Sequence, residues 1–200
     1  MSTMQARPLP KHYYTVAEWE KLPEYPRYEL IDGELFMMAR PSIEHQEINA
    51  ELTTQFRIYL RGKRCRVIPE PNLRLYVNGD TVVHPDLIIV CDPSKLQKNY
   101  CVGAPELVVE ILSPSTAIHD KFVKLNRYQQ VGVREYWIVD PLNRLVEVYQ
   151  WDNGLCHPHP YGPEDKIKVS VLDDCEIDLS LVFPEPEETE IDPENKREME

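Results

Sequence analysis

The sequence predicts a mixed β-sheet combined with helices, and three observations support this prediction. Two strongly apolar segments, residues 82–90 and 106–112, are typical of strands that are buried on both faces of a sheet. Asp-Gly and Asn-Gly pairs between strand-like segments predict hairpins, which place neighbouring strands antiparallel. The unit that runs from the Glu110 strand through a helix to the Tyr136 strand predicts a parallel crossover. We therefore expect strands of both orientations in one sheet.

The first half of the chain begins with a helix and a hairpin. Thr15 and Glu18 form a capping box that predicts a short helix ending at Leu22. The Asp-Gly pair that follows residues 28–31 predicts a hairpin with residues 34–38. Apolar side chains at helical spacing then predict a long helix over residues 43–60.

The second half alternates strands and helices. The Asn-Gly pair after residues 73–77 predicts a hairpin with the first apolar segment, and a loop over residues 92–104 leads to the second. A helix is expected from Thr116 to Val131, with Gly132 as its C-terminal cap. Its inner face should be an apolar stripe of Ile118, Phe122, Leu125 and Gln129. The further strands that we expect span residues 135–139, 145–151 and 167–172.

Length and composition are those of one globular domain. The chain has 200 residues, of which 42% are hydrophobic, enough to bury a core, and we expect residues 1–183 to form a single domain. Residues 184–200 contain eight acidic and only two basic side chains, so they account for half of the net charge of −12. This composition predicts a disordered acidic tail.

The rest of the sequence argues against several classes of protein. No run of apolar residues approaches the length of about 18 that a membrane span needs, and the first ten residues lack the apolar core of a secretory signal. The acidic body argues against a sequence-blind nucleic-acid binder. Five scattered cysteines fit reduced thiols and a cytoplasmic location better than a disulfide framework or a zinc site. Five basic residues between Arg57 and Arg66 would contact phosphates or form a solvated helix end.

Asp86 and Glu110 are the first candidate site residues, because each is a carboxylate within an apolar strand segment. A buried, unpaired carboxylate costs several kcal/mol, so each needs a partner, and Mg²⁺ or Mn²⁺ suits their hard oxygen atoms. Alternatively, each lies at a strand end, in water or paired with an arginine. The pair His157 and His159 has no further Cys or His at ligand spacing, so a loop is the expected structure there.

Asp120, Lys124 and Tyr128 form a polar stripe on the helix that follows Glu110. Their i, i+4, i+8 spacing places them on one side of the helix. Such an Asp–Lys pair is commonly a solvated surface pair, but a lysine close to two carboxylates also suits phosphodiester chemistry. Both interpretations stay open on spacing alone.

Four motifs in order resemble the Uma-two family of restriction-endonuclease-like proteins, within the PD-(D/E)XK nuclease superfamily. They are residues 28–34, 84–86, 104–115 and 132–141. The resemblance implies an α/β, restriction-endonuclease-like core with a central mixed sheet flanked by helices, and a homodimer. It implies a Mg²⁺- or Mn²⁺-dependent endonuclease that hydrolyses phosphodiester bonds in DNA.

The same resemblance assigns roles to individual residues. Asp86 and Glu110 match the superfamily carboxylates, but Leu112 stands where the superfamily lysine is expected. In the Uma-two family the lysine has moved to the next helix, a context that Asp120, Lys124 and Tyr128 match, with Lys121 as a weaker candidate. The lysine would orient or deprotonate the attacking water. The family pattern also suggests Glu29 as a further metal ligand, and it includes His45 near the start of the long helix.

Two alternatives to this enzyme remain from the sequence. One is a catalytically inactive interaction or nucleic-acid-binding module, which the acidic surface and the displaced lysine favour. The other is a metal-dependent hydrolase that acts on another phosphate ester.

Overall fold

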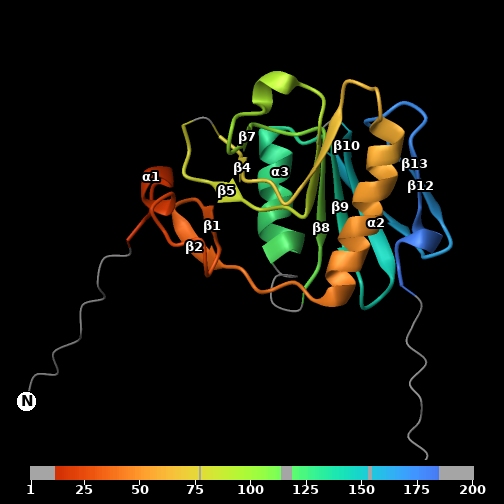
Figure 1. Cartoon of the computed structure of the whole chain (residues 1–200), viewed down its shortest axis with the longest axis horizontal. Helices are drawn as coiled ribbons and strands as arrows, with labels where there is room; N and C mark the ends of the chain where they lie inside the picture. The colour runs from red at the N-terminus through yellow and green to blue at the C-terminus, as the bar shows by residue number, and fades with distance from the viewer. Residues whose placement is uncertain (1–11, 77, 114–118, 153–154, 185–200) are drawn as a thin grey trace, which may run out of the picture.

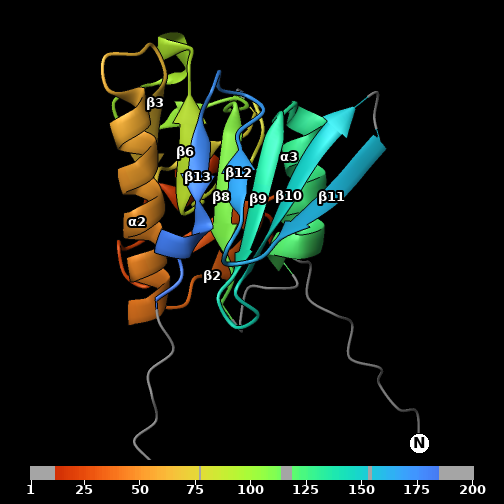
Figure 2. The ribbon, with the colours of Figure 1, turned by 90° about the vertical axis from the view of Figure 1, so that its right-hand side faces the viewer.

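A six-stranded mixed sheet forms the centre of the protein. The computed structural model describes residues 12–76, 78–113, 119–152 and 155–184. The strand order is β11-β10-β9-β8-β6-β3, in which β8 and β9 are parallel and the other neighbours antiparallel (Figure 2). The predicted parallel crossover is therefore confirmed. The strands are β3 Arg66–Pro69, β6 Leu87–Val90, β8 Leu107–Ile111, β9 Glu135–Asp140, β10 Leu145–Asp152 and β11 Leu155–Tyr161.

A smaller five-stranded sheet has the order β2-β1-β5-β4-β7, and a separate hairpin pairs β12 with β13. The β1–β2 turn has positive φ angles at Asp32 and Gly33, 51° and 81°, as a two-residue Asp-Gly turn requires. The predicted β4–β5 hairpin is also present. The strands are β1 Tyr28–Ile31, β2 Glu34–Met37, β4 Leu73–Arg74, β5 Val82–Val83, β7 Cys101–Val102, β12 Lys166–Lys168 and β13 Glu176–Asp178.

Two helices begin directly after a side-chain cap, and the first of these caps was predicted. Thr15 and Glu18 make both hydrogen bonds of a capping box, and the long helix starts after the Ser42 cap. No helix within the described ranges is long and apolar enough to cross a membrane. The helices are α1 Val16–Trp19, α2 Ile43–Leu60, α3 Leu125–Val131, the 3₁₀ turns η1 Pro93–Lys95 and η3 Leu179–Leu181, and the π-helical turn η2 His119–Lys124.

The large sheet separates two cores. Helix α2 and the β12–β13 hairpin cover one face, and α3 with the smaller sheet covers the other (Figure 1). Side chains of β8 alternate between them, so Val109 packs towards α2 whereas Val108 packs towards α3. The same alternation directs Glu110 to the α3 side. Glu110, the carboxylate of β8, therefore points towards the helix that carries Lys124.

The structure corrects the prediction that residues 82–90 form one strand. Val82 and Val83 belong to β5 of the smaller sheet, and Leu87 begins β6 of the large sheet. Pro85 lies between them, and a proline cannot donate to a strand ladder. Asp86 consequently lies just before β6 rather than within a strand.

Residues 157–159 lie in a strand and not in the predicted loop. They are part of β11, which pairs only with β10 at the edge of the large sheet. Pro158 and Pro160 are compatible with this position, because an edge strand has one side without ladder partners. The prediction of a loop over residues 157–159 is therefore wrong.

The prediction of the inner helix face is wrong. Phe122 is 65% exposed, whereas Asp120, Lys124 and Tyr128 are 2%, 4% and 0% exposed. The polar stripe thus faces the protein interior, and the reason lies in the carboxylates that it meets there. Ile118 lies outside the described residues.

The structure joins Cys65 to Cys91 by a disulfide, so the prediction of reduced thiols is wrong for this pair. Cys65 precedes β3 and Cys91 follows β6, and the antiparallel register that pairs Arg66 with Val90 brings the two cysteines together. Disulfides are uncommon in reducing compartments, so the cytoplasmic location stays a prediction that the cysteines no longer support.

The predicted acidic tail lies outside the described residues, apart from Pro184. The single domain over residues 1–183 likewise stays a prediction.

Candidate active site

Strand register brings Asp86 and Glu110 together. Strand β6 pairs antiparallel with β8, with Leu87 opposite Val109, so one further step places Asp86 opposite Glu110. Residues that are directly opposite in such a pair project to the same face of the sheet. The backbone N–H of Ile111 donates to Asp86 Oδ2 over 2.7 Å, which fixes this carboxylate against the end of β8. Asp86, directly before β6, and Glu110 on the neighbouring strand β8 therefore lie close together.

His45 contacts the other oxygen of Asp86. It lies in the first turn of α2, and its Nε2 is 3.3 Å from Asp86 Oδ1. Burial lowers the pKa of His45, but the hydrogen bond and charge of Asp86 outweigh burial and raise the pKa above its usual value. The family pattern includes His45 near the start of the long helix, and the structure gives it Asp86 as a partner.

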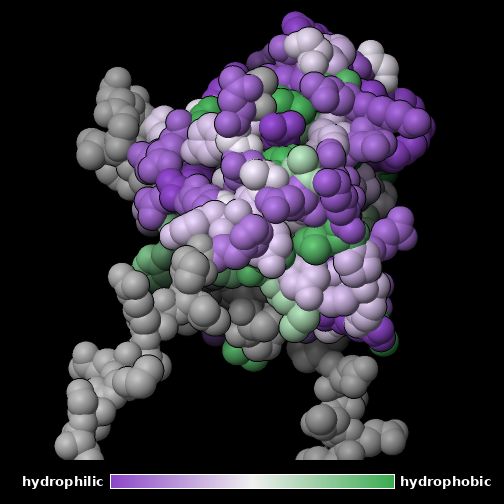
Figure 3. Space-filling model, turned by 90° about the vertical axis from the view of Figure 1, so that its left-hand side faces the viewer, coloured by the Kyte–Doolittle hydropathy of each residue, from purple (hydrophilic) through white to green (hydrophobic). Residues whose placement is uncertain are grey.

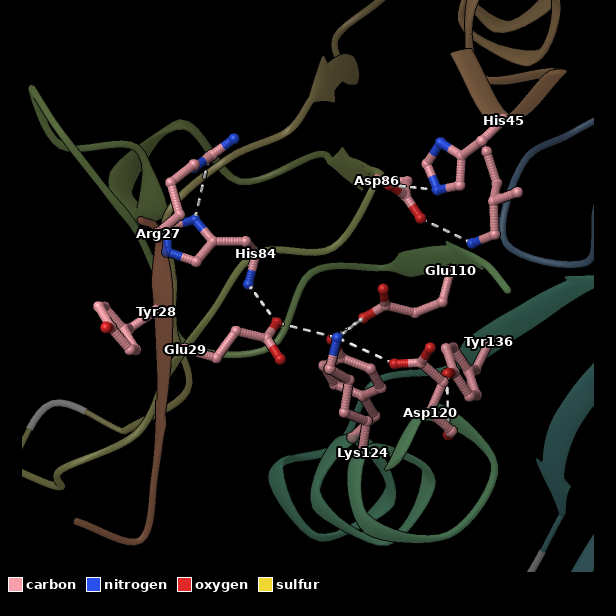
Figure 4. Close-up of polar contacts among 12 residues, drawn as sticks. Arg27, Tyr28, Glu29, His45, His84, Asp86, Glu110, Asp120, Lys124 and Tyr136 are labelled. Atoms are coloured by element: carbon pink, nitrogen blue, oxygen red, sulfur yellow. Dashed lines mark hydrogen bonds and ion pairs between the residues drawn. The ribbon is translucent and has the colours of Figure 1, made fainter. Parts of the chain in front are cut away.

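Lys124 lies at the centre of three buried carboxylates. Its Nζ is 2.9 Å from Glu29 Oε1, 3.1 Å from Glu110 Oε1 and 3.0 Å from Asp120 Oδ1 (Figure 4). Burial lowers the pKa of Lys124, but the charges of these neighbours outweigh burial and raise it well above the usual value. Lys124 is therefore a firmly charged ammonium. This network is what makes the burial of the polar helix stripe favourable.

Glu110 lies among like charges that disfavour its ionised form. Its Oε1 accepts hydrogen bonds from both Lys124 Nζ and the Tyr128 hydroxyl, the latter over 2.7 Å. Burial raises the pKa of Glu110 well above its usual value, and three neighbouring carboxylates add to the rise while Lys124 opposes it. The site therefore favours an additional positive charge near Glu110.

Glu29 is held from two directions. It comes from β1 of the smaller sheet and accepts the backbone N–H of His84 over 2.9 Å, besides its contact with Lys124. Burial raises the pKa of Glu29, but the Lys124 charge and the His84 N–H outweigh burial and lower it. Glu29 thereby connects the smaller sheet to the helix that carries Lys124.

These groups line one cavity of about 370 Å³. Its charged lining consists of five carboxylates and three lysine or arginine side chains, so the lining carries a net charge of −2 while His45 is neutral. The charged residues are Glu29, Glu70, Asp86, Glu110, Asp120, Arg27, Arg40 and Lys124. One divalent cation would bring the lining close to neutrality.

Arg27, Glu70 and His84 are among the cavity residues that were not predicted as site residues. Arg27 Nη1 is 3.1 Å from Glu70 Oε2, and Arg27 Nη2 is 3.4 Å from Nδ1 of His84. Burial lowers the pKa of His84 to about 4, so its ring is neutral and Nδ1 can accept from Arg27. His84 belongs to the His-Pro-Asp motif, which was a usable signal. The positions of Arg27 and Glu70 depend on how the smaller sheet packs, which no local pattern shows.

Lys121 and the basic residues between Arg57 and Arg66 lie away from the cavity. Lys121 Nζ is 3.6 Å from Glu147 Oε2 on β10, and neither residue lines the cavity. None of the five basic residues lines it either. Of the two candidate lysines, Lys124 is thus the one beside Glu110.

The donor atoms suit a hard divalent cation, although the site is not a complete cage of side chains. Across the ranges that the structure describes, no group of three or more His, Cys, Asp or Glu side chains is arranged to hold a metal ion. Asp86 and Glu110 together present carboxylate oxygens, the ligand type of Mg²⁺ and Mn²⁺, and Mg²⁺ commonly binds through one or two carboxylates and water. The role of Glu29 as a third ligand stays a prediction.

A family model described as "Putative restriction endonuclease", Uma2, matches residues 15–180. The chain belongs to the Uma2 family. Two proteins of Synechocystis sp. are similar to it, and both are called uncharacterized. The first is 30% identical over 78% of this chain and 82% of its own length, and the second is 29% identical over 61% and 71%.

A solved structure confirms the fold of this Uma2 protein. The crystal structure of a "putative nuclease belonging to DUF820" from Anabaena variabilis matches with a TM-score of 0.72 at 22% identity, over 84% of this chain and 97% of that one. The predicted α/β, restriction-endonuclease-like architecture with a central mixed sheet flanked by helices is therefore confirmed.

Proposed function

We propose that this protein is a Mg²⁺- or Mn²⁺-dependent endonuclease that hydrolyses phosphodiester bonds in DNA. The observation that carries the proposal is the Lys124 ammonium, which lies 3.1 Å from Glu110 on the strand next to Asp86. The superfamily pattern has a lysine at the position of Leu112, and in this chain the amine of Lys124 on the following helix would serve instead. The membership in a family of restriction-endonuclease-like proteins supports the same activity.

Asp86 and Glu110 would hold the cation, because they combine hard oxygen atoms with a net negative surrounding. Such a cation, when bound, lowers the pKa of a coordinated water and stabilises charge on a phosphate oxygen. The Ile111 N–H and the Tyr128 hydroxyl keep the two carboxylates oriented. Pre-positioned ligands of this kind reduce the reorganisation that catalysis requires.

Lys124 would act as a cation rather than as a base. The surrounding carboxylates raise its pKa, which favours the charged ammonium and makes it a poor acceptor for the proton of the attacking water. It can donate hydrogen bonds to that water or to a phosphate oxygen and stabilise the charge that develops there. Of the two predicted roles, the structure supports orientation and charge stabilisation over deprotonation.

Calorimetry with Mn²⁺, together with a cleavage assay on DNA, tests the proposal. We expect one Mn²⁺ site per chain in the wild type, and loss of both binding and cleavage in Asp86→Asn, which keeps an acceptor for Ile111 but removes the charge. Asp92→Asn is the matched control, since Asp92 is a carboxylate outside the cavity lining. Equal Mn²⁺ binding by the wild type and Asp86→Asn would contradict the metal assignment.

A binding module without activity is the second candidate. The observation that favours it is the closed network in which Lys124 is already shared by three carboxylates. This candidate predicts DNA binding without Mn²⁺ binding or cleavage. Cleavage of a nucleotide-ester panel but not of DNA would instead identify the hydrolase of another phosphate ester. The homodimer that the family resemblance implies is tested by light scattering on the purified protein.

A further inference from the structure

The cavity has an apolar wall that the chemistry of phosphodiester cleavage does not use. Residues 35–39, from β2 and the segment after it, and Pro41 form this wall. Tyr25 also lines the cavity, and Tyr25 and Met37 are exposed apolar side chains, at 62% and 68%. An apolar wall beside a charged site indicates a ligand with both a polar and an apolar part.

Two arginines stand at this apolar part of the cavity. Arg40 Nε donates to the Tyr25 hydroxyl over 3.0 Å, and its guanidinium lies 5.0 Å from the centre of the Tyr25 ring. Arg27, two residues after Tyr25, is held by Glu70 and His84. The Tyr25 ring thus contacts Arg40 while 62% of the residue stays exposed. An exposed aromatic ring next to guanidinium groups is the combination on which nucleobases stack while their phosphates are bound.

The surface around the cavity favours a small bound group over a protein partner. On the face that carries α1 and the β1–β2 hairpin, hydrophobic residues are interspersed among hydrophilic ones outside the parts drawn in grey (Figure 3). Broad apolar patches are what protein-docking surfaces present. The cavity of about 370 Å³ lies at the lower end of the roughly 300–1,000 Å³ of small-molecule sites.

We infer that this wall receives one unpaired nucleobase, so that the substrate is DNA with a single-stranded nucleotide at the cleavage position. The inference rests on the proposed function, since the phosphate of this nucleotide would lie towards Asp86 and Glu110. In a duplex the base faces are stacked and paired, and only sugars and phosphates would meet the wall. A single-stranded nucleotide can instead place its base against Tyr25 and Met37.

Fluorescence anisotropy tests the inference as binding, separately from cleavage. The probes are a labelled single-stranded oligonucleotide of about 12 nucleotides and the duplex of the same sequence, with Ca²⁺ as the divalent ion. We expect the single strand to bind the wild type at least about tenfold more tightly than the duplex. Tyr25→Ala should weaken single-strand binding by about 5- to 150-fold, which is the range of one base–aromatic stack. Tyr25→Phe should retain most of the binding, because the ring remains.

Two further variants distinguish a loss of base stacking from a general loss of folding. Tyr13→Ala is the matched control, since Tyr13 is 59% exposed and does not line the cavity; it should bind like the wild type. Met37→Ala should weaken binding with an unchanged melting temperature. Equal affinity for duplex and single strand, or wild-type affinity in Tyr25→Ala, would overturn the inference.

The outcomes also separate this inference from the proposed function. Cleavage of DNA without any effect of Tyr25→Ala on the affinity would overturn the base site alone. The expected binding pattern without cleavage in Mg²⁺ or Mn²⁺ would retain the base site and overturn the nuclease. Absence of binding to either probe would overturn both.

Discussion

Replacing Lys124 by methionine should destabilise the protein strongly at neutral pH. Methionine has nearly the same length, so the change removes the charge while it leaves little empty volume. Glu29, Glu110 and Asp120 would then lose a shared counter-ion in a site where the side chains are only 2–7% exposed. Removal of one partner from a buried ion pair costs about 3–5 kcal/mol. For a protein of this size, each kcal/mol lowers the melting temperature by about 2–4 °C, so we expect a decrease of about 6–20 °C.

The pH dependence of this loss identifies its cause. In the wild type the raised pKa of Lys124 keeps the ammonium charged at every pH below its usual value of 10.5. In Lys124→Met the three carboxylates would bind protons more readily when folded than when unfolded, so the stability of the variant should rise as pH falls. We therefore expect the difference from the wild type to be largest at pH 7.5 and clearly smaller at pH 5.

Urea denaturation followed by circular dichroism measures both quantities, with Lys121→Met as the control. Lys121 pairs with Glu147 at 3.6 Å, and both side chains are about 30% exposed, so its replacement should cost about 0–1 kcal/mol. A loss below about 1 kcal/mol in Lys124→Met, or an equal loss at pH 7.5 and pH 5, would refute the assignment of Lys124 as the counter-ion of this network.

Three further predictions concern other parts of the chain. Burial lowers the pKa of His84 to about 4, so between pH 6.5 and 4 the unfolded chain binds a proton that the folded protein does not. The stability of the protein should therefore fall as the pH decreases through this range. An NMR titration midpoint of the His84 ring near 6.5 would contradict this. Burial raises the pKa of Cys101 and of Cys175 to about 11, so peptide mapping at pH 8 should find both thiols unlabelled until the protein unfolds, and rapid labelling of either would disprove the burial. Deletion of residues 185–200 leaves buried Phe183 in place and should change the melting temperature by less than about 2 °C; a larger decrease would show that the domain extends beyond residue 183.

The elements that periodicity and caps specify were predictable from sequence. The long helix α2 has the predicted bounds, because its apolar spacing and its cap agree. Asp86 and Glu110 were found because a carboxylate in an apolar segment needs a partner. Lys124 required the family resemblance, since on spacing alone the helix stripe was equally compatible with a surface pair.

Features that depend on distant partners were not predictable. The apolar stripe through Phe122 was assigned to the interior because polar residues usually face solvent. Burial of the polar stripe with Lys124 is favourable only because Glu29 and Glu110, on two distant strands, supply carboxylates that pair with it. The disulfide between Cys65 and Cys91 requires the β3–β6 register, which no cysteine spacing shows. Strand β11 was missed because residues 157–159 were considered only as a possible metal fragment or a loop.

The register between β6 and β8 has a consequence for how this chain can change in length. Side chains alternate with a period of two, so a single residue inserted between Asp86 and the end of β6, or within β8 before Glu110, would turn one carboxylate to the α2 face. The loop over residues 92–100, between the Cys91 disulfide and β7, is under no such constraint, because its length does not affect which residues of β6 and β8 face each other. Functional relatives should therefore differ in length in that loop and keep the four-residue distance from Asp86 to Val90 unchanged.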